Sequence, residues 1–167
     1  NDHVNCAQST NDAYPSAFRY AFIRMNKGLV SELQLLIESL RRKGDEYNTS
    51  IKMGRTQLQD AVPMTSGQEF HAFANNLEEE IANLGRNVKL LYEINMGGTA
   101  IGTGLNARAG YAELCIKKMC ELTGEPFLKA SDLVEATPDT GAYVSYSAAL
   151  KRLAVKLSKT CNDLRLM

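Results

Sequence analysis

The feature that most constrains the fold is a pair of interleaved heptad series between residues 67 and 93. Apolar residues at heptad spacing lie along one side of an α-helix and form the seam of a helical bundle. The sequence therefore predicts a long helix from about Gly67 to Glu93 that packs against other long helices. The seam residues are Ala74, Ile81 and Val88 in one series and Leu77, Leu84 and Leu91 in the other.

Three further segments repeat apolar residues at intervals of three and four, which is typical of amphipathic helices. They cover residues 17–40, 111–122 and about 143–166. Pro15 needs no amide hydrogen and suits the first turn of the first segment, while Gly124 and Pro126 end the second. The predicted apolar face of the first segment comprises Phe18, Phe22, Met25, Leu29, Leu33, Leu36 and Leu40.

These patterns predict an all-α fold, a long-helix bundle that forms one domain over residues 1–167. The apolar faces exceed what one small bundle can hide, so we expect some of them to meet other subunits in an oligomer. The last helical pattern is still periodic at Met167, which favours a chain that continues beyond this residue. Within the second helix, Glu78, Glu79 and Glu80 are expected to face solvent or to pair with Arg86 and Lys89, with no catalytic role.

Composition excludes several classes of function. Acidic and basic residues balance at 19 each, so the chain has neither a basic surface for nucleic acid nor a polybasic stretch for a membrane. No apolar run is long enough to span a bilayer. The four cysteines lack metal or redox spacing, and His3 and His71 lack ligand partners, so we expect no metal and a reduced, cytoplasmic protein.

Two clusters of small polar residues are the candidates for chemistry. Gln8-Ser9-Thr10-Asn11-Asp12 precedes the first helix, where free amides and the helix dipole favour an anion. Helix capping alone is the simpler explanation of this cluster. The second cluster, Gly54–Asp60, belongs to an irregular connection over residues 52–65, in which an Arg55–Asp60 pair could tie the loop down. Uncharged hydroxyls and amides of this kind suit a small anionic substrate.

The glycine-rich segment 97–107 matches a relaxed dinucleotide fingerprint over Gly102–Ala107. Such a site needs a preceding strand of a parallel sheet and a later acidic residue, and this sequence predicts a bundle helix before it instead. No Lys-Ser or Lys-Thr follows, which also excludes a P-loop. We therefore expect no nucleotide cofactor, and the threonines and Asn106 of this segment should support the fold or a neighbouring site.

The two clusters, the glycine segment, residues 135–143 and the ending Lys159–Met167 together resemble the aspartase/fumarase superfamily over essentially the whole chain. The resemblance is greatest to its ammonia-lyases. Many hydratases of the superfamily, and some of its ammonia-lyases, carry histidine where this chain has Gln57. Both Gln57 and the ending Leu164-Arg165-Leu166 count against a fumarase.

The resemblance implies reversible anti elimination of ammonia from L-aspartate to give fumarate, without a cofactor. It implies that Ser9 and Thr10 hold the β-carboxylate, Asn11 the amino group and Thr56 the α-carboxylate, while Gln57 lines the amine pocket. None of these is a general base. The superfamily's base is a serine in a glycine-serine loop whose motif is missing here, so we expect it beyond Met167, with the N-terminal and C-terminal domains also missing.

The resemblance further implies a homotetramer whose active sites combine residues from three subunits. The isolated chain is then expected to be inactive even if it folds. Two alternatives remain open from the sequence. One is a fumarase or another fumarate-releasing lyase of the superfamily, and the other is a structural helical bundle without activity, as in the lens crystallins of the superfamily.

Overall fold

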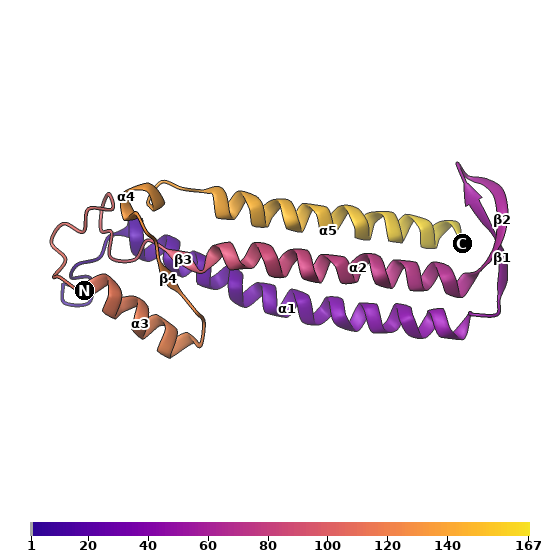
Figure 1. Cartoon of the computed structure of the whole chain (residues 1–167), viewed down its shortest axis with the longest axis horizontal. Coiled ribbons are helices and arrows are strands. Elements are labelled where there is room, and N and C mark those ends of the chain that lie inside the picture. Colours follow the sequence, from indigo (N-terminus) through magenta and orange to yellow (C-terminus); the bar gives the residue numbers. More distant parts are fainter. Residues whose placement is uncertain (1) are drawn as a thin grey trace. The chain divides into compact units, whose positions relative to one another are not determined.

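The computed structural model describes residues 2–167, and helices dominate it (Figure 1), which confirms the predicted all-α class. Residue 1 of the predicted domain lies outside the described residues. Two short two-stranded sheets, one antiparallel and one parallel, accompany the helices. The elements in chain order are α1 (Thr10–Glu46), β1 (Ile51–Thr56), β2 (Gln59–Thr65), α2 (Ser66–Val88), the 3-10 helix η1 (Lys89–Leu91), β3 (Glu93–Ile94), α3 (Tyr111–Thr123), β4 (Leu128–Lys129), α4 (Leu133–Ala136) and α5 (Gly141–Leu166).

The chain divides into two compact units. Unit 1 comprises the residues up to Asn26 together with Arg86–Ser147, and unit 2 comprises Lys27–Gly85 together with Ala148–Met167. The helices α1, α2 and α5 each contribute to both units.

Unit 2 is a helical bundle in which segments of α1, α2 and α5 run side by side (Figure 1). Its core confirms the predicted seam, because Ala74, Leu77 and Leu84 are fully buried, although Ile81 is only half-buried. In unit 1, the seam continues through the buried Val88 and Leu91. The regular helix ends at Val88, about one turn before the predicted end, and η1 follows it.

The predicted face of α1 is partly wrong. Phe18, Met25 and Leu36 are 43%, 71% and 39% exposed, whereas Ile23 and Ile37, which lie outside the predicted face, are buried. The helix carries two apolar stripes, and periodicity alone does not say which of them packs within one chain. The helix also begins at Thr10, so Pro15 lies in its second turn and not in its first.

The connection over residues 52–65 is a β-hairpin and not an irregular loop. Strands β1 and β2 pair antiparallel up to Thr56 and Gln59, with an irregularity between Met53 and Arg55. The two turn residues, Gln57 and Leu58, both have positive φ angles, 50° and 62°. Such turns normally carry asparagine or glycine, and their absence removed the signal by which a hairpin is recognised in a sequence.

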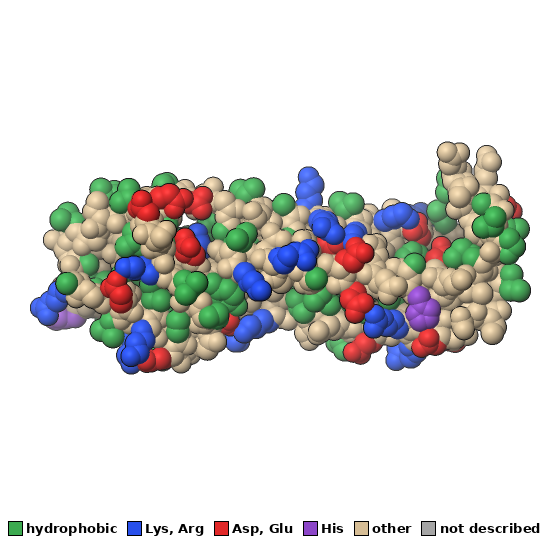
Figure 2. All heavy atoms as spheres, viewed as in Figure 1, with side chains coloured by type: hydrophobic (Ala, Val, Ile, Leu, Met, Phe, Trp, Pro, Cys, Tyr) green, Lys and Arg blue, Asp and Glu red, His purple; other side chains and the backbone are tan. Residues whose placement is uncertain are grey.

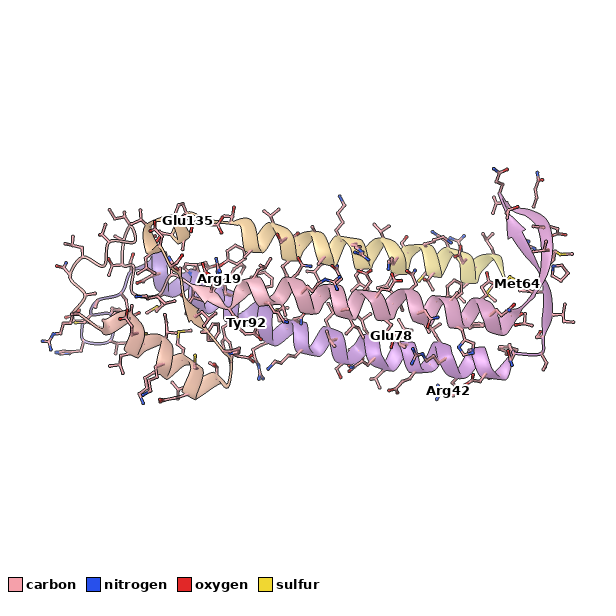
Figure 3. The ribbon with its side chains drawn as sticks, viewed as in Figure 1. Arg19, Arg42, Met64, Glu78, Tyr92 and Glu135 are labelled. Carbon is pink, nitrogen blue, oxygen red and sulfur yellow. The ribbon has the colours of Figure 1, made fainter. Side chains whose placement is uncertain are left out.

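The expectation for Glu78, Glu79 and Glu80 also needs correction. Glu78 and Glu79 are exposed, but Glu80 is fully buried in unit 2, where its carboxylate lies 2.6 Å from Lys156 Nζ on α5. Their partners are Arg41, Arg152 and Lys156. Glu78 points from α2 to α1 (Figure 3), where Arg41 Nη2 is 2.6 Å from its Oε2. All three residues therefore join helices that are distant in sequence.

Unit 1 packs the first turns of α1 and α5 with the shorter elements. Arg19 is buried on α1 (Figure 3), where its guanidinium donates hydrogen bonds to the carbonyl oxygens of Leu90 and Glu93 and lies over the Tyr143 ring. The helix α3 ends at Gly124 with a φ of 71°, as the sequence predicts. The charged side chains on the face shown in Figure 2 are of both signs and interspersed. None of the helices formed by residues 2–167 combines the length and apolar content needed to cross a membrane.

Candidate functional site

The first polar cluster forms a reciprocal cap at the start of α1. Ser9 Oγ accepts a hydrogen bond from the Asn11 amide at 3.1 Å, and Asp12 Oδ1 accepts one from the Ser9 amide at 2.8 Å. The pair is a variant of the capping box, in which the acid is aspartate and Ser9 Oγ accepts the amide of Asn11 rather than that of Asp12. Because the cap uses only an acceptor lone pair of Ser9, its hydroxyl hydrogen is still available to a carboxylate. Helix capping and substrate binding are therefore compatible at Ser9.

A recess of about 410 Å³ opens beside this cap in unit 1. Thr10 lies in it on the exposed first turn of α1, where the positive end of the helix dipole favours an anion. Its hydroxyl can act as a donor to a carboxylate oxygen. The recess is lined by Asn5, Gln8, Ser9, Thr10, Ala13 and Tyr14.

Asn11 does not line the recess, and its side chain is fixed on the glycine segment. Its Nδ2 donates a 2.7 Å hydrogen bond to the carbonyl oxygen of Ala100. A carbonyl oxygen can only accept, so the carboxamide must turn its nitrogen to Ala100. The Oδ1 atom of this exposed residue is thereby left as the acceptor for another molecule.

Asp12 is fully buried and accepts only backbone amides. Besides the Ser9 amide, its carboxylate accepts the amides of Gly97 and Thr99 at 3.2 and 2.9 Å. From the sequence, Asp12 is expected only as a member of the polar cluster and of a helix cap. Its spacing from Ser9, a hydroxyl residue followed by an acid three positions later, was the available signal for this arrangement.

The glycine segment is the loop that these contacts hold. Gly97, Gly102 and Gly104 have positive φ angles, and a Cβ at Gly102 would lie 2.3 Å from the Leu133 carbonyl oxygen. Thr99 and Asn106 also have positive φ, 58° and 67°. The element directly before this segment is not the expected bundle helix but β3, which pairs in parallel with β4 on the other side of α3. Each of these strands has only two residues, and α3 begins at Tyr111, so Gly102 does not lead directly into a helix as a dinucleotide-binding turn does.

Tyr111 is a titratable side chain close to Asp12. Burial raises its pKa, and the charges of Cys115 and Asp12 raise the pKa further. A phenol with a raised pKa is neutral at ordinary pH and is a poor proton acceptor.

The second cluster lies at the tip of the hairpin in unit 2. Thr56 and Gln57 are both exposed, at the end of β1 and in the turn. Gln57 lines a recess of about 370 Å³ together with Lys52 and Arg55. Arg55 Nε lies 3.7 Å from Asp60 Oδ1, so the predicted pair is formed, and Arg55 Nη1 also donates to the Leu166 carbonyl oxygen at 3.1 Å.

The structure thus brings the predicted site residues together in two sets. Ser9, Thr10 and Asn11 lie together in unit 1, and Thr56 and Gln57 lie together in unit 2. Among residues 2–167, no group of three or more histidine, cysteine or acidic side chains could hold a metal ion. His71 Nε2 lies 3.2 Å from Asp45 Oδ1 in unit 2, and all four cysteines are free thiols.

With a helical fold and two sets of hydroxyl and amide donors, the chain belongs to the Lyase family, whose sequence profile matches residues 1–167. It is 58% identical over its whole length to the aspartate ammonia-lyase of Escherichia coli strain K12 and 53% identical to that of Helicobacter pylori. The chain spans 35% and 36% of the lengths of these two relatives.

Solved structures agree in fold. The fumarate lyase:delta crystallin of Brucella melitensis bound to cobalt superposes on 99% of the chain with a TM-score of 0.95 and 51% identity, and the chain covers 36% of that structure. The class II fumarase of Schistosoma mansoni superposes on 98% of the chain with a TM-score of 0.87 and 31% identity, and 37% of it is covered.

Proposed function

We propose that a full-length lyase carrying this segment catalyses the reversible deamination of L-aspartate to fumarate and ammonia by anti elimination. The observation that carries this proposal is the cap at the start of α1, where Ser9 Oγ is engaged only as an acceptor, the exposed Thr10 lines the recess, and Asn11 is held through its Nδ2. The aspartate ammonia-lyases that share 53% to 58% of their residues with the chain support the same substrate.

The chemistry explains why such donors are needed. The proton next to the β-carboxylate of aspartate is weakly acidic, and its removal builds a second negative charge on that carboxylate. Donors already in place stabilise this charge as it forms and need no reorganisation during the reaction. Hydroxyls and helix amides provide such donors without adding a competing base.

Each residue then has a role in the proposed site. Ser9 and Thr10 bind the β-carboxylate, and Asn11 binds the amino group through its Oδ1. Thr56 binds the α-carboxylate, and Gln57 lines the amine pocket. Because none of these groups is a base, we propose that a serine outside residues 1–167 removes the proton.

We further propose a homotetramer in which Ser9–Asn11 and Thr56–Gln57 of one active site come from different subunits. The exposed stripe of α1 that contains Phe18, Met25 and Leu36 supports association, since apolar surface of this kind is normally covered. The isolated 167-residue chain would then lack both the base and the neighbouring subunits, so we expect it to be inactive. The free cysteines fit a reduced, cytoplasmic protein. We propose that the reaction uses neither a metal nor another cofactor.

A fumarase is the second candidate, because the class II fumarase of Schistosoma mansoni shares the fold at 31% identity. Gln57, in place of the histidine of many fumarases, favours the ammonia-lyase. A structural protein without activity is a weaker candidate, since a scaffold has no need for the donors at the start of α1.

The test follows fumarate absorbance with a full-length lyase carrying this segment. L-Aspartate and L-malate are supplied separately as the only substrate. We expect fumarate from aspartate alone. Fumarate from malate alone would show that the enzyme is a fumarase. Fumarate from neither compound would mean that the protein acts on another substrate or is a structural protein without activity.

A further inference from the structure

The helix α1 cannot supply a hydrogen-bond donor to the backbone carbonyl oxygen of Asn11. The carbonyl oxygen of Asn11 would normally accept the amide of the residue four positions later, but that residue is Pro15, which has no amide hydrogen. Asn95 replaces the missing donor, because its Nδ2 donates to the Asn11 oxygen at 2.9 Å. Asn95 is buried, and the same amide group also contacts Thr137 Oγ1 at 3.2 Å.

The side chain of Asn11 is held separately, by the Ala100 carbonyl oxygen at 2.7 Å. The position of that oxygen depends on residues 97–100, and this stretch is fixed by Asp12, which accepts the amides of Gly97 and Thr99. Thr99 has a φ of 58°, an unfavourable angle for a β-branched residue that the surrounding contacts must maintain. Although Asp12 is the next residue in sequence, it acts on the Asn11 side chain indirectly, because it fixes the loop whose Ala100 carbonyl oxygen accepts from Asn11 Nδ2.

We propose that Asp12 and Asn95 are positioning residues that fix Asn11 at its carboxamide and its backbone, so that Asn11 presents only its Oδ1 acceptor to the leaving group of the substrate. The proposal rests on the proposed role of Asn11 in binding the amino group. A substrate ammonium has only hydrogens to donate, so a fixed acceptor matches it. A carboxamide free to rotate would present its NH₂ group part of the time and lose this match.

The test is a double-mutant cycle in a full-length lyase carrying this segment, with L-aspartate as the substrate. Asp12→Asn keeps the shape of the side chain but has a single, uncharged acceptor oxygen, so an NH₂ group must face either the Ser9 amide or the Gly97 and Thr99 amides, and the hold on the loop is weakened. We expect it to lower kcat/KM by about tenfold when Asn11 is present. The Asn11→Ala variant retains the other substrate-binding donors. In this variant, adding Asp12→Asn should alter the remaining kcat/KM by less than about twofold.

The matched control is Asp132→Asn. Asp132 caps α4 by accepting the amides of Val134 and Glu135, so this change weakens an aspartate cap of the same unit whose hydrogen bonds involve neither Asn11, Asp12 nor Asn95. We expect no effect on kcat/KM in either background. A loss from Asp12→Asn that is equally large with and without Asn11 would overturn the proposal, because a general structural role predicts additive losses.

Asn95→Ala provides the second variant if Asp12→Asn fails to fold. It should also lower kcat/KM only when Asn11 is present, while Thr137→Val, which removes the other partner of Asn95, should leave kcat/KM unchanged. Equal losses from Asn95→Ala in both Asn11 backgrounds would count against the proposal. A parent enzyme that forms no fumarate from aspartate would contradict the proposed function instead, and the two failures are therefore distinguishable.

Discussion

Asp12 in unit 1 and Glu80 in unit 2 are both carboxylates with 0% exposure, yet their partners are of opposite kinds. Asp12 accepts three backbone amides, from one cap and one loop. Glu80 lies against two side-chain cations, with Lys156 Nζ at 2.6 Å and Arg152 Nη2 at 2.9 Å. A buried carboxylate needs compensation in either case, because burial without partners is costly.

The difference shows what each carboxylate can determine. Backbone amides belong to fixed peptide planes, so Asp12 dictates the path of the loop that carries Ala100. The cations of Lys156 and Arg152 are at the ends of flexible chains, so Glu80 joins α2 to α5 without fixing the position of any backbone atom to a fraction of an ångström. We therefore expect changes around Asp12 to affect catalysis and changes around Glu80 to affect stability.

The largest expected effect on stability comes from Lys156→Met. Burial acts to lower the pKa of Lys156, but the hydrogen bonds of its ammonium to Glu80 and Glu79 raise the pKa above its ordinary value. Removing the ammonium leaves Glu80 buried with Arg152 as its main partner. We expect a loss of about 3 kcal/mol in the free energy of unfolding, measured by denaturant titration, with little change in kcat.

Two further variants sharpen this prediction. Lys159→Met removes an exposed lysine of the same helix, whose partner is Asp163, and should cost less than about 1 kcal/mol. Adding Glu80→Gln to Lys156→Met should restore more than half of the loss, because the buried carboxylate charge that lost one of its two cations is then removed as well. If the two lysine variants were equally stable, Glu80 would not depend on Lys156.

A smaller effect is expected at Thr99, whose positive φ belongs to the loop held by Asp12. Thr99→Gly and Thr99→Ala both remove the hydroxyl and the γ-methyl group and keep the amide that Asp12 accepts, and they differ only in the Cβ atom. Only glycine adopts a φ of 58° without strain. Thermal unfolding should show Thr99→Gly more stable than Thr99→Ala by about 1 kcal/mol. Equal stability of the two variants would mean that the loop stores no backbone strain at Thr99.

The sequence predicted the parts of this structure that follow from periodicity. Three features could be predicted because each depends on residues close together in the chain. They are the heptads of α2, the end of α3 at Gly124 and the Arg55–Asp60 pair. The buried face of α1 could not be predicted, since Phe18 and Ile23 are equally apolar and only the packing partners decide which of them is covered. Glu80 was missed because its partners on α5 are more than 70 positions away.

Part of the candidate site could be recognised from local sequence patterns and part of it could not. The residues of the first cluster were found as a group, and the spacing of Ser9 and Asp12 could have revealed the capping box. Asn95 has no local signal, because its role arises from the amide hydrogen that Pro15 lacks, and only the fold brings the two together. The polar clusters proposed to bind substrate can thus be picked out from the sequence, whereas the contacts that hold them, such as that of Asn95, require the structure.

The smallest expected effect separates Glu79 from its buried neighbour Glu80. The hydrogen bond from Lys156, together with its charge, lowers the pKa of the Glu79 carboxyl below its ordinary value of 4.5. A lowered pKa in the folded state contributes stability above the unfolded value, and this contribution disappears as the pH falls through the folded value. Glu79→Gln should therefore lower the Tm slightly at pH 7, with the difference from the parent enzyme shrinking as the pH falls below 4.5 and vanishing once it has passed through the lowered folded pKa. A difference that stayed constant down to pH 3 would show that the side chain stabilises the helix by packing and not by its charge.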